Sequence, residues 1–270
     1  MPELPEVETT RQGIAPHMEG RRIEKITVRD RRLRWPIPED LPGRMTGQQV
    51  LAVDRRGKYL LFRFPQGSAI VHLGMSGSLR LITDQSPPLR HDHVEVILDQ
   101  GTTLRYNDPR RFGCWLWAED PYQHPLLASL GPEPLDTTFS GPYLHRLSQG
   151  KTTPVKHFLM DSRTVVGVGN IYANEALFKA GIHPRRSAGR ISRDRYTLLA
   201  QAIRETLSAA ILMGGTTLRD FINSDGKPGY FSQSLQVYGR GGAPCHQCAA
   251  QLKEIRMSQR TTVYCGQCQR

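Results

Sequence analysis

The sequence predicts a multidomain α+β protein: a β-rich N-terminal part, a helical middle and a small C-terminal ribbon built around a metal. Three observations predict this arrangement. Short segments within about the first 120 positions show apolar alternation, apolar residues recur every four positions after residue 190, and two pairs of cysteines lie near the end. A chain of 270 residues is long enough for two domains and a small module.

The strands are expected first along the chain. Val94, Val96 and Leu98 share one face of an alternating run, residues 99–101 supply a turn, and the alternation resumes at Leu104, which predicts a hairpin. Residues 50–64 predict a second hairpin broken near residue 57, and residues 69–73 a further strand. A helix should open the chain, because proline suits a first helical turn and acidic residues suit its positive end.

The helical part should begin after Gly131 and Pro132, where the sequence places a domain boundary. A long helix is predicted between Ser192 and Gly214, with a shorter one at about residues 171–180. The apolar face of the long helix is expected to consist of Leu199, Ile203, Leu207 and Ile211. The predicted domains are residues 1–132, 133–235 and 236–270.

The charge of the chain favours a polyanionic partner. The net charge is +11 and the isoelectric point about 9.7, so nucleic acid is the leading candidate. An anionic membrane surface is a weaker alternative, because no strongly amphipathic basic helix is evident. No run of about 18 apolar residues predicts a membrane span, and the first residues lack the pattern of a signal peptide, which favours the cytosol.

The cysteines near the end have metal-ligand spacing. Two C-x2-C pairs are separated by sixteen residues, and they consist of Cys245, Cys248, Cys265 and Cys268. Each pair can direct two thiolates at one ion, so the pattern predicts a closed, structural zinc site. Two redox or disulfide pairs are the alternative. Basic residues surround the ribbon, and Arg260 stands out on a probable hairpin.

The N-terminus carries a second possible chemistry. Removal of Met1 would leave Pro2 with a free secondary amine, part of which is unprotonated near neutral pH. Such an amine can attack a sugar C1′ and form an iminium ion. Glu3 follows directly and could donate a proton to the opening sugar ring.

Several blocks in order along the chain resemble the formamidopyrimidine-DNA glycosylase family. They are residues 2–8 (PELPEVE), 58–60 (KYL), 72–77 (HLGMSG), 108–113 (DPRRFG), 167–172 (GVGNIY), 224–229 (SDGKPG) and the cysteine ribbon. The resemblance implies an N-terminal β-sandwich with flanking helices, a helical helix–two-turns–helix domain and a zinc ribbon. It further implies a bifunctional N-glycosylase and abasic-site lyase that excises 8-oxoguanine and formamidopyrimidines from damaged double-stranded DNA.

The resemblance also implies roles for individual residues. Pro2 would be the Schiff-base nucleophile, Glu3 the general acid and Glu6 a supporting carboxylate. Lys58 would serve β-elimination, and Arg260 phosphate binding and δ-elimination. The gap left by the extruded base would be filled by Met75, Arg110 and Phe112.

Further positions resemble those that hold DNA. The DNA backbone would be bound by His72, His91, Lys151 and Asn170. Lys156 would lie near the lesion, and residues 223–230 would form a lid over the everted base. One structural Zn²⁺ is implied, and we expect a monomer in the bacterial cytoplasm, associated with the nucleoid through DNA.

Two alternatives remain open at this point. The related endonuclease VIII branch prefers oxidised pyrimidines, although the opening motif and the Met75, Arg110 and Phe112 set resemble the purine branch. A non-catalytic zinc-ribbon protein that binds or shapes DNA would explain the charge and the cysteines equally well. Only the N-terminal chemistry separates this second alternative from an enzyme.

Overall fold

The structure is a computed structural model that describes residues 2–84, 86–216 and 230–270. The chain divides into two compact units. The first unit comprises residues 1–128 and 213–230, and the second comprises residues 129–212 and 231–270. The predicted three-domain division, with boundaries at residues 132 and 235, stays a prediction.

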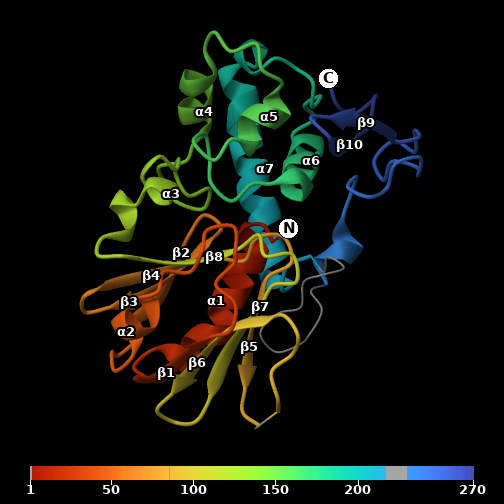
Figure 1. Ribbon diagram of the computed structural model, residues 1–270. Helices are drawn as coiled ribbons and strands as arrows, with labels where there is room; N and C mark the ends of the chain where they lie inside the picture. Colours follow the sequence, from red (N-terminus) through yellow and green to blue (C-terminus); the bar gives the residue numbers. More distant parts are fainter. Residues whose placement is uncertain (1, 85, 217–229) are drawn as a thin grey trace. The chain divides into compact units, whose positions relative to one another are not determined.

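The first unit contains two antiparallel four-stranded sheets (Figure 1). One sheet has the order β1-β6-β7-β5 and the other β2-β3-β4-β8. The strands are β1 Ile23–Val28, β2 Ala52–Arg56, β3 Tyr59–Phe64, β4 Gly67–His72, β5 Ser78–Ile82, β6 Asp92–Leu98, β7 Thr103–Asn107 and β8 Cys114–Ala118. Both predicted hairpins form, as β2–β3 and β6–β7.

The core of this unit lies between the sheets and helix α1 (Leu4–Met18). A single cluster of buried apolar side chains draws on α1, on both sheets and on the short helix α2 (Leu41–Met45). Tyr106 of β7 meets Trp115 of β8 edge-on, with ring centroids 5.9 Å apart. These contacts confirm the predicted β-sandwich with flanking helices.

The polar face of β6 is buried as well as its apolar face. Glu95 is only 7% exposed. Its carboxylate accepts hydrogen bonds from Arg105, at 2.7 Å, and from Arg29. The alternating sequence of β6 therefore does not indicate a solvent-exposed polar face. Ion pairs cover that face. A buried charge is tolerated when it is paired in this way.

The second unit packs helices around α7 (Arg193–Leu212), which contacts both α4 (Gly141–Ser148) and α6 (Asn170–Lys179). Residues 161–169 form turns between α5 (Val155–Met160) and α6, which is the predicted helix–two-turns–helix arrangement. The remaining short elements within the described residues are η1 Pro121–Gln123, α3 Pro125–Ala128, η2 Ala188–Arg190 and η3 Phe231–Ser234.

The ribbon contains a hairpin of β9 (Lys253–Met257) and β10 (Arg260–Tyr264), which lies between its two cysteine pairs. Its turn consists of Ser258 and Gln259, which both have left-handed backbone conformations, with φ of 45° and 61°. The apolar side chains of the ribbon do not form a core alone. They pack in one cluster with Phe178 of α6 and with Val237, so the ribbon shares its core with the helical part of the unit.

Candidate active site and nucleic-acid interface

The start of α1 holds the two residues expected to act on the sugar. Pro2 and Glu3 are buried immediately ahead of the helix, and Glu3 is 2% exposed. Glu3 and Glu6 form a reciprocal capping box, in which the Glu6 carboxylate accepts the Glu3 backbone N–H at 2.8 Å. The other oxygen of Glu6 accepts the backbone N–H of Thr216, also at 2.8 Å. The carboxylate therefore fixes the backbone from which Pro2 projects.

Lys58 and His72 are brought together by the β2–β3–β4 meander. Gly57 and Lys58 form the two-residue turn between β2 and β3, and Gly57 has φ of 58°. Tyr59 lies opposite His72 across β3 and β4, with ring centroids 4.8 Å apart. Burial, together with the nearby positive charges of Lys58 and Arg34, lowers the pKa of His72 to about 4.

The hydrogen bond of His72 identifies its tautomer. Its Nδ1 lies 2.9 Å from the backbone N–H of Gly74 and accepts from it. Since the ring is neutral near pH 7, its proton must be on Nε2. His72 can therefore donate from Nε2 to a phosphate oxygen without carrying a charge itself.

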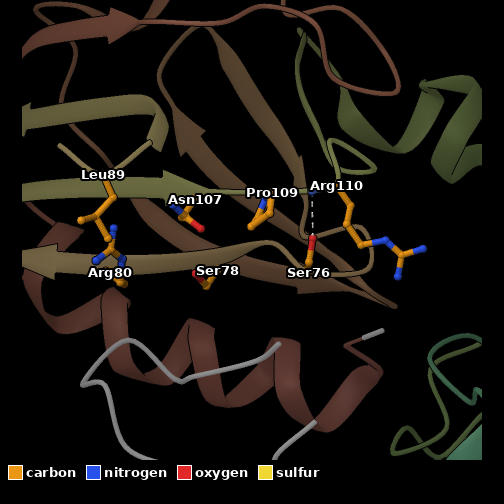
Figure 2. A pocket seen from close by; sticks show the side chains of 7 residues that line it. All are labelled: Ser76, Ser78, Arg80, Leu89, Asn107, Pro109 and Arg110. Carbon is orange, nitrogen blue, oxygen red and sulfur yellow. Dashed lines mark hydrogen bonds between the residues drawn. The ribbon is translucent and has the colours of Figure 1, made fainter. Parts of the chain in front are cut away.

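Three predicted gap-filling residues lie on two loops of the first unit. Arg110 and Phe112 are exposed, Phe112 to 43%, and Met75 is half-buried. The Arg110 guanidinium stacks over the Phe112 ring at 5.0 Å, within the range of a cation–π contact. Figure 2 shows the Arg110 side chain extending away from the other labelled side chains. A large apolar side chain exposed beside an arginine is suited to enter a base stack.

A buried acid that sequence reasoning left without a role supports these loops. Asp108 is fully buried, and its carboxylate accepts hydrogen bonds from the Ser76 hydroxyl at 2.8 Å and the Gly113 N–H at 2.9 Å. The Ser76 oxygen in turn accepts the Arg110 N–H at 3.2 Å, drawn dashed in Figure 2. The backbone carbonyl of the half-buried His91 accepts the Asp108 N–H at 3.0 Å.

A pocket of about 290 Å³ adjoins the same loops (Figure 2). Leu89 and Pro109 contribute apolar surface, and the polar groups belong to Ser76, Ser78, Arg80, Asn107 and Arg110. Arg80 is held at one side by Asp92, with its guanidinium 2.6 Å from the carboxylate.

In the second unit, three polar side chains fasten the ribbon hairpin to the helices. Lys156 of α5 is 1% exposed and donates from Nζ to the Thr262 hydroxyl at 2.7 Å and the Thr261 carbonyl at 3.2 Å. Asn170 donates to the same carbonyl at 3.1 Å, and Asn174 accepts the Val263 N–H at 3.0 Å. The Lys156 ammonium thus contacts β10, and its predicted place near a lesion stays a prediction.

The other predicted DNA contacts of this unit are exposed. Lys151 lies in the loop between α4 and α5, and Arg260 is the first residue of β10. Burial lowers the pKa of His157 of α5, and the nearby positive charges of Lys156 and Arg260 lower it in the same direction. Asn170 begins α6 directly after the turns that contain Gly167, whose φ is 80°.

The four cysteines form a compact cluster that fits a metal ion. Their sulfur atoms lie within 4.8 Å of one another. Cys245 and Cys268 are 3.9 Å apart, and Cys248 and Cys265 are 3.4 Å apart. Four thiolates around one zinc ion at about 2.3 Å would be separated by roughly 3.8 Å, so the spacing suits tetrahedral coordination.

Comparison with known proteins agrees with this architecture. Residues 1–115 match the formamidopyrimidine-DNA glycosylase N-terminal domain, and residues 130–222 match the H2TH domain of the same proteins. A formamidopyrimidine-DNA glycosylase of Marinobacter nauticus is 68% identical over 270 residues, covering all of both chains.

Solved structures of the Lactococcus lactis Fpg protein are also similar. A variant bound to Fapy-dG containing DNA has a TM-score of 0.92 and 33% identity, with 100% of both chains covered. A complex with an abasic site containing DNA has a TM-score of 0.91 and 33% identity, with 99% of both chains covered.

The fold and the matches together define a DNA glycosylase of DNA repair with a cysteine cluster able to hold a metal. The chain belongs to the formamidopyrimidine-DNA glycosylase family. Over the residues that the structure describes, no helix combines the length and the apolar character needed to cross a membrane.

Proposed function

We propose that this glycosylase excises oxidised purines, 8-oxoguanine and formamidopyrimidines, and then cleaves the strand by β,δ-elimination. The observation that carries the proposal is the start of α1, where Glu6 holds Glu3 and the backbone next to Pro2 in one buried arrangement. The Lactococcus relative bound to Fapy-dG containing DNA and to an abasic site supports the substrate class.

The chemistry requires Pro2 as the first residue, and Met1 lies outside the described residues. The unprotonated Pro2 amine attacks C1′ as the glycosidic bond breaks, and the base leaves with the bonding electron pair. The base takes up a proton, and the Pro2 nitrogen loses one in exchange. Glu3 donates a proton to the ring oxygen, and the opened sugar becomes an iminium ion on Pro2. Loss of a C2′ proton then expels the 3′ phosphate, and a second elimination expels the 5′ phosphate.

Other residues would bind the DNA and assist the eliminations. Lys58, at the turn beside His72, serves β-elimination, and His72 donates from Nε2 to a phosphate. Arg260 binds a phosphate for δ-elimination. Further backbone contacts come from His91, Lys151 and Asn170, while Lys156 acts near the lesion. The proposed lid, residues 223–230, lies outside the described residues except for Tyr230.

The cysteine cluster would hold one Zn²⁺ through Cys245, Cys248, Cys265 and Cys268. The ion supplies no reaction step, because protein thiolates fill all four positions. Its contribution is folding free energy for a ribbon that has little core of its own. We place the enzyme in the bacterial cytoplasm as a monomer acting on damaged double-stranded DNA.

Borohydride trapping on duplex DNA with one abasic site tests the proposal. The processed protein should form a covalent adduct, and Pro2→Gly should abolish it. Pro36→Gly, in an exposed loop of the same unit, is the matched control and should trap normally. A wild-type protein that binds this DNA but forms no adduct would instead support a purely architectural role. Faster removal of thymine glycol than of 8-oxoguanine would move the substrate to the endonuclease VIII class.

A further inference from the structure

The two loops that carry Met75 and the Arg110–Phe112 segment touch through their backbones. Gly74 has φ of 65°, and a Cβ atom there would lie 2.4 Å from the carbonyl carbon of Phe112. A Cβ atom on Gly113 would lie 2.4 Å from the His72 carbonyl oxygen. No side chain larger than hydrogen fits at either contact, so the loops are packed directly against each other.

Asp108 is the first residue of the loop that carries Arg110 and Phe112, and its side chain joins this loop to the Met75 loop. One carboxylate oxygen accepts the hydroxyl of Ser76, which directly follows Met75, and the other accepts the N–H of Gly113, which directly follows Phe112. The Tyr106 hydroxyl also donates to this second oxygen, at 3.0 Å. The same carboxylate therefore binds both loops at positions adjacent to the residues expected to enter the stack.

The carboxylate has no contact with solvent, since Asp108 is fully buried. A charged acceptor surrounded by donors in a dry environment forms strong hydrogen bonds, and an unpaired one would be costly. Ser76 extends the network, because its oxygen accepts the Arg110 N–H while its proton goes to Asp108. In the observed relative position of the loops, the Ser76 and Tyr106 hydroxyls and the Gly113 and Arg110 N–H groups all have acceptors.

We infer that Asp108 is a positioning residue that assembles the Met75 loop and the Arg110–Phe112 loop into one preformed wedge for duplex DNA. The inference rests on the proposed function, in which these residues replace the everted nucleotide. A wedge already assembled in the free protein avoids the cost of ordering two loops during insertion. Asp108 itself touches neither substrate nor the reacting atoms.

Two substrates separate this role from a general effect on folding. Excision of 8-oxoguanine from a duplex needs the wedge, whereas strand cleavage at an abasic site in a single-stranded oligonucleotide has no stack to fill. Asp108→Asn keeps the size of the side chain but places an NH₂ group against donors. We expect excision from the duplex to fall on the order of 10- to 100-fold, with cleavage of the single strand within about twofold of wild type.

Ser76→Ala provides a second variant in case Asp108→Asn folds poorly. It removes the bond between the Met75 loop and Asp108 and should lower the ratio of duplex to single-strand rates in the same direction. Asp92→Asn is the matched control, because Asp92 is 2% exposed and accepts hydrogen bonds from Arg80 and Asn107. It should lower thermal stability and leave the ratio unchanged.

The outcomes are distinct. A reduced ratio in Ser76→Ala and in folded Asp108→Asn supports the preformed wedge. Equal loss on both substrates, or an unchanged ratio in Ser76→Ala, overturns it and leaves Asp108 as a purely structural residue. A wild-type protein inactive on both substrates would instead refute the proposed function and the inference with it.

Discussion

Replacing Glu6 by glutamine should weaken both the fold and the reaction. Glu6 is fully buried and accepts two backbone N–H groups, from Glu3 and Thr216, each at 2.8 Å. Glutamine has one acceptor oxygen, so one of these N–H groups would face an NH₂ group. Losing a hydrogen bond to a buried charge costs about 1.5–3 kcal/mol. At the middle of that range, the melting temperature of a chain of this size should fall by about 5–9 °C.

The same change should slow adduct formation, because Glu6 orients the backbone next to Pro2. If the activation free energy rises by about 1.4 kcal/mol, the rate of adduct formation falls about tenfold. Calorimetry and the rate of borohydride trapping measure the two effects. Glu19→Gln is the control, since this exposed acid at the other end of α1 accepts the Val53 N–H and glutamine can do the same. If Glu6→Gln melts and traps like Glu19→Gln, the proposed support of Pro2 by this carboxylate is wrong.

Three further predictions concern charge and metal. The pKa of His72 is lowered to about 4, below the value of about 6.5 in an unfolded chain, so protons favour unfolding and His72 reduces stability as the pH falls from 6.5 towards 4. Its imidazole resonances should titrate near pH 4, and Lys58→Met should raise that midpoint; a midpoint near 6.5 contradicts the lowering of the pKa by burial and charge. Arg260→Ala should weaken DNA binding and reduce the salt slope by about one, without moving the melting temperature, because the side chain is exposed. Metal analysis should find about one zinc per chain, and Cys248→Ser should lower that content and weaken DNA binding; full metal-free activity would exclude the structural ion.

The strands and the long helix could be predicted where the pattern was local. The β6–β7 hairpin and α7 follow from apolar periods of two and about four. Strand β1 gave no such signal, because Glu24 and Lys25 interrupt its apolar residues and a register shift lies between Ile23 and Lys25. Its place is set by pairing with β6, which is distant in the sequence.

In the candidate site, too, local patterns could be interpreted from the sequence and contacts between distant residues could not. The cysteine spacing and the Pro2-Glu3 start could be interpreted from neighbouring residues. The role of Asp108 could not, because it depends on Ser76, 32 positions away. The contacts of Lys156 could not be predicted either, since its ammonium donates to the Thr262 hydroxyl, 106 positions along the chain. Which donor meets which acceptor is determined by tertiary packing rather than by residue type.

The turn of the ribbon hairpin has a consequence for engineering thermostability. Ser258 and Gln259 both adopt the left-handed conformation that asparagine and glycine accept more readily. Exchanging the pair for Asn-Gly would relieve backbone strain of roughly 1–2 kcal/mol per residue. Arg260 directly follows this turn, so the relaxed hairpin would hold the backbone of Arg260 in place up to a higher temperature.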